Sequence, residues 1–79
     1  MSVLTLIKQT GHAHKILTID YRDSKGVVSR REVEPYEIKN GYFFGYDIDK
    51  DEIRQFKITS ILAAEPTEES FTPRWPIKL

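Results

Sequence analysis

Aromatic and arginine side chains gather in one short stretch, NGYFFGYDIDKDEIRQF, which covers residues 40–56. Four of the nine aromatic residues of the chain lie within five consecutive positions there, and an arginine follows them: Tyr42, Phe43, Phe44, Tyr46 and Arg54. Aromatic rings can stack on nucleic acid bases, and arginine can bond a phosphate through two parallel hydrogen bonds. The first question is therefore whether these rings form a core or a displayed binding platform.

Alternation along an extended strand divides these rings between the two faces of a sheet. Tyr42, Phe44 and Tyr46 would share one face, whereas Phe43 would lie on the other. Both faces of a sheet one layer thick cannot be core. Two interpretations stay open: either the rings wrap around a bent sheet and Arg54 pairs with a nearby carboxylate, or some of them form a binding site.

The rest of the pattern predicts one short helix and about five short strands. Ser2 is a good helix N-cap and Gly11 a good helix stop. Alternating apolar residues separated by turn residues predict strands over residues 15–21, 27–38, 42–48, 53–58 and 60–65. In a chain of 79 residues, this series predicts a mainly β fold, a small and strongly bent β-barrel with one short N-terminal helix.

The barrel is expected to form a single domain over residues 1–66, followed by a proline-containing C-terminal tail over residues 67–79. A domain of this size has a thin core and little room for a deep, enclosed active site. Phe71, Trp75 and Ile77 are the apolar residues that could anchor the tail. The sequence does not decide whether Trp75 packs on the barrel.

Composition excludes several classes of function. Twelve basic and twelve acidic residues give a net charge of zero, so any anion site must be local. The chain has no cysteine, which excludes disulfides, thiolate zinc sites and cysteine nucleophiles and favours a reducing, cytoplasmic location. No apolar run approaches the length of a membrane span, and the N-terminus lacks the features of a signal peptide, so no membrane partner is expected.

Catalysis and metal binding are not expected either. His12 and His14 lie close together in sequence but have no third ligand nearby. The acidic connection at residues 47–52 lacks the glycine and the terminal glutamate of a calcium loop. Hydroxyl residues such as Ser29 and Ser60 have no partnered base, and no glycine-rich phosphate loop is present. The sequence therefore predicts a protein that is not an enzyme and that uses no metal and no cofactor.

Three motifs together resemble the WYL domain, a ligand-sensing module that commonly follows a helix-turn-helix in bacterial transcription regulators. The family's Arg-x-Val-x-Pro motif falls on residues 31–35, and its Arg-x-Phe-x-Leu motif falls on residues 54–58, where isoleucine replaces leucine. The name-giving Trp-Tyr-Leu falls on residues 42–44, where YFF keeps only the aromatic, aromatic, apolar character. Ser60 stands where the family usually has an arginine, so one expected basic residue is missing.

The resemblance covers nearly the whole chain and implies an SH3-like or Sm-like β-barrel. It also implies an aromatic and basic patch that binds an anionic ligand, either a nucleotide or single-stranded nucleic acid. The ligand-binding residues would be Arg31, Tyr42, Phe44 and Arg54, with Arg30 and Arg22 as helpers. The rings would stack on bases and the arginines would hold phosphates. With zero net charge, affinity for nucleic acid is expected to be weak and strongly salt-dependent.

Several partners stay open. No helix-turn-helix precedes the matching region and Met1 resembles a natural start, so we expect a lone module that acts through a partner chain, as a small anion-binding protein, or as a homodimer that pairs an exposed strand edge. A second hypothesis is an SH3-like protein interaction domain, in which the tail TPRWPIKL at residues 72–79 could occupy a groove. A third is a structural remnant without a ligand.

Overall fold

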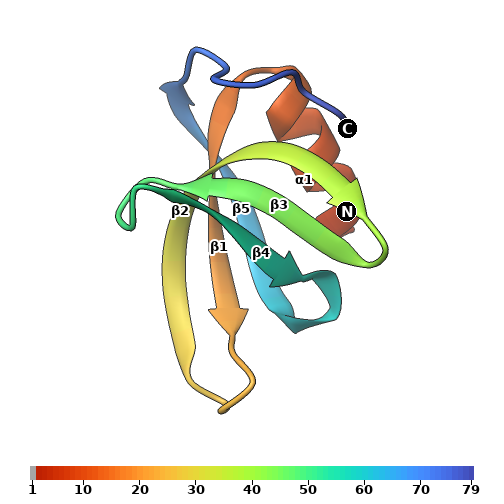
Figure 1. The fold of residues 1–79 in the computed structure, drawn as a ribbon, viewed down its shortest axis with the longest axis vertical. Coiled ribbons are helices and arrows are strands. Elements are labelled where there is room, and N and C mark those ends of the chain that lie inside the picture. Colours follow the sequence, from red (N-terminus) through yellow and green to blue (C-terminus); the bar gives the residue numbers. More distant parts are fainter. Residues whose placement is uncertain (1) are drawn as a thin grey trace.

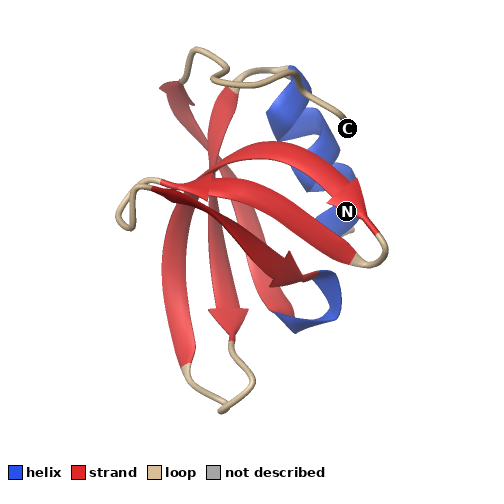
Figure 2. Ribbon diagram, in the orientation of Figure 1, coloured by secondary structure: helices blue, strands red, loops and turns tan. Residues whose placement is uncertain are grey.

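The computed structural model describes residues 2–79 as one short helix followed by five strands (Figure 1). The elements in chain order are α1 (Val3–His12), β1 (Lys15–Arg22), β2 (Val28–Lys39), β3 (Tyr42–Asp47), β4 (Glu52–Lys57), the 3-10 turn η1 (Ile58–Ser60) and β5 (Ile61–Ser70). All neighbouring strands are antiparallel. Figure 2 shows that strands dominate the chain, so the predicted mainly β fold with one N-terminal helix is confirmed.

The five strands form one open sheet in the order β4-β3-β2-β1-β5. Among the described residues, the edge strands β4 and β5 do not pair with each other, so the expected closed barrel is not confirmed. The sheet instead bends through β2, whose first half pairs with β1 and whose second half pairs with β3. The register with β3 shifts between Pro35 and Glu37, as expected where a proline cannot donate to the ladder.

Helix α1 begins at the predicted N-cap, because the Ser2 hydroxyl accepts a hydrogen bond of 3.1 Å from the Thr5 N–H. The helix does not stop at Gly11 as predicted but includes it and ends one residue later, at His12. Gly11 is buried, and a Cβ atom there would collide with the end of the Leu79 side chain. No helix within residues 2–79 is long and apolar enough to cross a membrane.

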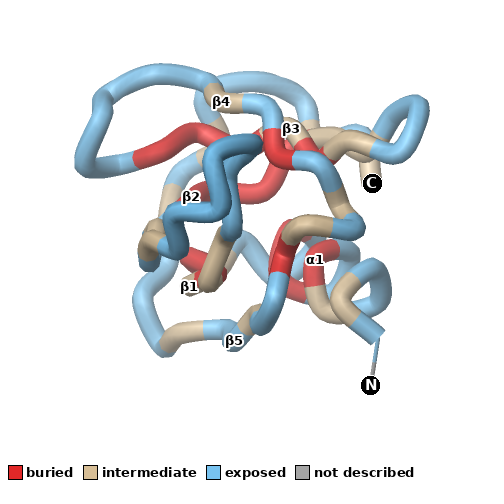
Figure 3. The backbone as a smooth tube through the Cα atoms, turned by 90° about the horizontal axis from the view of Figure 1, so that it is seen from below, coloured by how far each residue is buried: buried red, intermediate tan, exposed pale blue. Residues whose placement is uncertain are grey.

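The core lies between α1 and the side of the sheet that faces it. Its members come from the helix and from every strand: Ile7, Leu17, Ile19, Val33, Phe43, Phe56 and Ile61. We call the side of the sheet that carries these strand residues the inner face and the opposite side the outer face. Figure 3 shows the buried stretches towards the middle of the molecule, whereas the turns and much of the edge strands β4 and β5 are exposed.

The last strand is longer than expected, because β5 continues past Pro66 to Ser70. A proline is tolerated there since β5 is an edge strand. The residues that follow are anchored to the rest of the fold. The Phe71 N–H donates to the His14 carbonyl at 2.9 Å, and the Lys78 N–H donates to the Tyr36 carbonyl at 2.7 Å.

Candidate ligand-binding site

The predicted ligand residues lie on two faces of the sheet. Residues that stand directly opposite each other in neighbouring strands share a face. Arg31 lies opposite the core residue Ile19, and Arg54 lies opposite Gly45, so both arginines belong to the inner face. Tyr42 and Phe44 alternate with the fully buried Phe43 and therefore belong to the outer face. The sheet separates the predicted rings from the two main predicted arginines.

Arg22 and Arg30 also belong to the outer face, in the β1–β2 ribbon. Arg30 stands opposite Asp20 and binds its carboxylate through two hydrogen bonds, Nε–Oδ1 at 2.9 Å and Nη2–Oδ2 at 3.3 Å. This contact with Arg30 lowers the pKa of the Asp20 carboxyl and raises the pKa of the guanidinium. Arg22 stands opposite Val28 and has no ion-pair partner among residues 2–79. Arg30 is therefore already engaged, whereas Arg22 is free.

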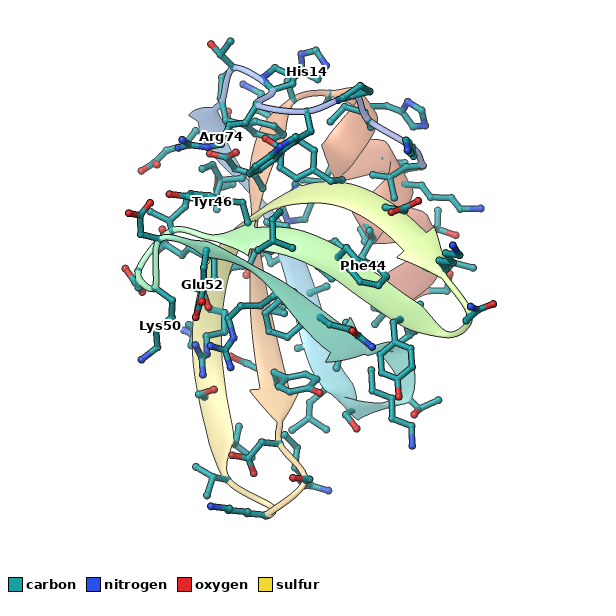
Figure 4. The ribbon with its side chains drawn as sticks, in the orientation of Figure 1. His14, Phe44, Tyr46, Lys50, Glu52 and Arg74 are labelled. Atoms are coloured by element: carbon teal, nitrogen blue, oxygen red, sulfur yellow. The ribbon has the colours of Figure 1, made fainter. Side chains whose placement is uncertain are left out.

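Four charged side chains form what we call the inner charge cluster: Arg31, Asp47, Glu52 and Arg54. Arg31 Nη1 lies 2.9 Å from Asp47 Oδ2, and Arg54 Nη1 lies 3.1 Å from Glu52 Oε1. The two ion pairs are neighbours, because Asp47 and Glu52 stand opposite each other in β3 and β4. Figure 4 shows Glu52 and Lys50 at this end of the sheet. The cluster carries two positive and two negative charges.

Asp47 is the buried member of the inner charge cluster. Its side chain has no solvent exposure, while that of Arg31 is 20% exposed. Its second oxygen accepts the Lys50 N–H at 3.2 Å, which ties the cluster to the hairpin turn. Arg31 Nε donates to the Ser29 hydroxyl at 3.1 Å. Arg31 is therefore fixed by two partners and presents little of its guanidinium to a ligand.

Arg54 is the available member. Its side chain is 40% exposed, and its Nη1 bonds only the exposed Glu52 of its own strand. Within residues 2–79, its Nε and Nη2 make no hydrogen bond to protein. These donors can bind an oxyanion as a pair.

Tyr21 is the aromatic residue that shares the inner face with both arginines. It stands opposite Ser29, its ring packs edge-on against Phe56 at 5.0 Å, and its hydroxyl accepts the Lys57 N–H at 3.2 Å. Sequence reasoning missed Tyr21 as a functional candidate. Two signals place Tyr21 on the same face as Arg31. Tyr21 shares a face with Ile19 two positions before it in the strand, and Arg31 stands across from Ile19.

The outer face carries a separate apolar groove of about 300 Å³. Its lining comes from β2, β3, β4 and the C-terminal segment: Tyr36, Glu37, Phe44, Ile53, Trp75, Pro76 and Lys78. The Trp75 ring meets Tyr36 edge-on at 5.2 Å, so the tryptophan packs on the sheet while 46% of it stays exposed. Phe44 thus lies in a surface that is apolar and has no arginine in its lining.

A larger groove of about 680 Å³ lies over the outer side of β5, β1 and β2. Its charged lining is mostly acidic: Asp20, Arg30, Glu32, Glu65 and Glu68. With Arg30 already bound to Asp20, this groove repels anions. Size alone therefore does not identify the ligand site.

A buried polar network holds the C-terminal segment against the sheet. The nearly buried Glu34 carboxylate accepts hydrogen bonds from Tyr36 Oη at 2.6 Å and from Arg74 Nε at 3.1 Å. The Arg74 guanidinium also lies 4.1 Å from the centre of the Tyr46 ring, in a cation–π contact visible in Figure 4. Burial raises the pKa of Tyr36 to about 12.

We expect this raised pKa to make stability fall at alkaline pH. The unfolded chain loses the tyrosine proton near pH 10, and the folded protein near pH 12. The contribution of neutral Tyr36 is therefore complete below pH 10 and is lost as pH rises towards 12. Urea unfolding across this range should show a shallower decline for Tyr36→Phe than for the parent protein. Tyr42→Phe is the matched control, and equal slopes for the parent and Tyr36→Phe would contradict the assignment.

The two histidines have structural partners. His12 Nε2 lies 2.8 Å from the Leu79 carbonyl oxygen, and the His14 ring lies 6.0 Å from the Phe71 ring. Within residues 2–79, no three side chains of His, Cys, Asp or Glu gather in a way that could hold a metal ion.

Comparisons with known proteins identify the family. A solved structure, proteasome accessory factor B/C (PafBC) of Arthrobacter aurescens, has a similar fold with a TM-score of 0.76 at 20% sequence identity. The similarity covers 95% of this chain but only 13% of that protein, so it concerns the fold alone. No curated protein matches this sequence. The WYL domain model matches residues 2–66, most of the chain, and the chain therefore belongs to the WYL domain family.

Proposed function

We propose that the chain is a ligand-binding regulatory module that recognises an anionic ligand, a nucleotide or single-stranded nucleic acid, through the inner charge cluster. The observation that carries this proposal is the pair of unused donors on Arg54, on the same face as Arg31 and Tyr21. Membership of the WYL family supports a ligand-sensing role. The SH3-like character implied by that family is compatible with a strongly bent, five-stranded sheet whose edge strands are joined by a 3-10 turn.

Binding requires only a small rearrangement. A phosphate would replace Glu52 as the partner of Arg54, and exposed ion pairs of this kind contribute little to stability. Tyr21 lies on the same face and offers a ring for a base. Because the cluster has no net charge, the affinity should be modest and should fall steeply with salt.

The separation of the rings from the arginines limits the ligand. A mononucleotide at Arg54 cannot reach Phe44 through the sheet. A longer single strand that crosses the free edge of β4 could contact Arg54 on one face and Phe44 or Tyr42 on the other. The set of residues predicted from the sequence therefore fits an oligonucleotide better than it fits a nucleotide.

We propose a binding role rather than a catalytic one. Both carboxylates of the inner charge cluster are bonded to arginines rather than to a nucleophile that they could activate as general bases. Serine, threonine and histidine residues of the chain show no such pairing in the sequence pattern. A protein that only binds its ligand needs no activated catalytic group, and the donors of Arg54 can supply the contact.

The test is an amide chemical-shift titration with a short single-stranded DNA of mixed sequence, at low and at physiological salt. We expect shifts at Tyr21, Arg31 and Arg54 that fade as salt rises. Arg54→Gln should weaken binding by about tenfold, the cost of one charge-assisted contact, with almost no change in stability because the side chain is half exposed.

Arg30→Gln is the matched control, since it makes the same chemical change at an arginine that Asp20 already holds. It should leave the DNA affinity unchanged. Equal affinity for Arg54→Gln and the parent protein would reject the inner cluster as the ligand site. Loss of binding in both variants would mean a diffuse electrostatic attraction rather than a site.

A second candidate function is an SH3-like protein interaction at the outer apolar groove. The observation that favours it is a groove between Phe44, Ile53 and Trp75, in which Trp75 is 46% and Ile53 is 42% exposed. Aromatic grooves of this kind accept extended, proline-rich peptides. In the same titration, a proline-rich peptide that shifts the amides around Phe44, with DNA shifting none, would favour this function over anion binding.

A further inference from the structure

Within residues 2–79, strand β4 has a free edge, along which its backbone pairs with no other strand. It pairs with β3 on one side and is the last strand of the sheet on the other. The Ile58 N–H donates to the carbonyl of Gly41, the residue just before β3, whereas the Lys57 N–H donates to the Tyr21 hydroxyl, away from β3. Because backbone groups alternate in direction along a strand, Ile53 and Gln55 also direct their N–H and C=O groups away from β3. Such an edge can accept another strand.

The side chains along this edge are self-complementary. Ile53 is apolar, 42% exposed, and belongs to the outer face beside the apolar groove. Glu52 and Arg54 flank it on the inner face and carry opposite charges. A copy of the same strand running in the opposite direction presents these three residues in reverse order.

We propose that a second copy of this chain pairs with β4 in an antiparallel arrangement centred on Ile53. The Ile53 residues of the two copies would then stand opposite each other and exchange two backbone hydrogen bonds. On the inner face, Glu52 of each copy would stand opposite Arg54 of the other, which gives two ion pairs. On the outer face, the two apolar grooves would meet at the paired isoleucines.

Other registers are excluded by charge or by hydrogen bonding. Residues that stand opposite each other must share a face of the sheet, and faces alternate along a strand. The two-fold axis of the dimer must therefore pass between two copies of the same residue. Centred on Arg54, the pairing places two arginines opposite each other, and centred on Glu52 it places two glutamates opposite each other, which is unfavourable. A pairing centred on Gln55 places Lys57 opposite Ile53 of the other copy and requires a backbone hydrogen bond from the Lys57 N–H. That N–H already donates to the Tyr21 hydroxyl. Ile53 is the centre that satisfies both faces.

The interface is small, since it consists of one short strand and the apolar residues beside it. Interfaces of this size form weak and transient complexes. The two Glu52–Arg54 contacts within the separate chains are exchanged for two contacts between the chains, which adds specificity of register more than affinity. The dimer is therefore concentration-dependent.

Sedimentation equilibrium over a wide range of protein concentration tests the proposal, with charge reversals as the variants. Glu52→Arg gives each strand two positive charges, so like charges face each other in the homodimer. Arg54→Glu gives each strand two negative charges. We expect each variant alone to be monomeric and an equimolar mixture of the two to form a heterodimer, because opposite charges then face each other at both positions.

Leu62→Lys is the matched control on the other edge strand, where Leu62 is 48% exposed, and this variant should dimerise like the parent protein. Amide spectra test whether each variant is folded. If a charge variant does not fold, Ile53→Lys replaces it, and this variant should also be monomeric. A parent protein that stays monomeric at every concentration overturns the proposal. Homodimers of Glu52→Arg as stable as those of the parent, or a mixture that stays monomeric, overturn it as well.

Discussion

Phe43→Ala is expected to lower the free energy of unfolding by about 4 kcal/mol, whereas Phe44→Ala is expected to lower it by about 1 kcal/mol. Phe43 has no exposed surface and packs against Phe56 with ring centres 5.9 Å apart. Its removal leaves a cavity in a thin core that cannot collapse around it. Phe44 is only partly buried, at the outer groove, so its loss creates no enclosed cavity.

Urea unfolding of both variants measures this difference, and Phe44→Ala is the matched control because the same atoms are deleted one position away. A domain of this size has a total stability of about 4–12 kcal/mol, so Phe43→Ala can be largely unfolded without denaturant. Phe43→Leu, with a smaller cavity, then supplies the measurement. Equal losses at the two positions would mean that the faces of β3 are assigned wrongly.

Local patterns predicted the features that depend on near neighbours in sequence. Turn residues separate the predicted strands, and among them the structure places Asn40 and Gly41, after β2, at positive φ values of 53° and 81°, as in a tight turn. The alternation in residues 42–46 separated Phe43 from Tyr42 and Phe44, as the burial of β3 shows. Both features are determined within a few residues, so the sequence was sufficient for them.

Contacts between distant residues could not be predicted in the same way. Pro66 reads locally as the end of a strand, but it lies on an edge opposite Leu17, where the missing N–H costs little. The C-terminal segment is held by Arg74 on Glu34, two residues forty positions apart. The open sheet likewise depends on which strands meet, which no local pattern contains.

The same contrast between local patterns and contacts of distant residues applies to the candidate site. The motifs identified Arg31 and Arg54, and the fold places both on the inner face. The family resemblance supplied a set of residues without their faces, so it grouped these arginines with Tyr42 and Phe44. Partners from other strands, such as Asp47 for Arg31 and Asp20 for Arg30, then decide which guanidinium is available to a ligand.

Asp47→Ala should be the most destabilising change in the inner charge cluster. Asp47 is fully buried, and its two oxygens accept hydrogen bonds from Arg31 and from the Lys50 N–H. Its removal leaves the mostly buried Arg31 charge without a partner and the turn without its acceptor, which should cost about 3 kcal/mol. Asp20→Ala is the matched control, because it removes a carboxylate that binds Arg30 equally closely but at the surface, and it should change stability little.

A double substitution separates the buried charge from the lost contact. In Asp47→Ala with Arg31→Met, no charge stays uncompensated, so urea unfolding should show a smaller loss than the sum of the two single changes. Additive losses would show that the ion pair is not what stabilises this end of the sheet.

Asp47→Asn connects stability to binding, because it keeps the size of the side chain but weakens the contact with Arg31. We expect this variant to be less stable and to bind single-stranded DNA more tightly than the parent protein, because Asp47 both positions Arg31 and competes with a phosphate for its donors.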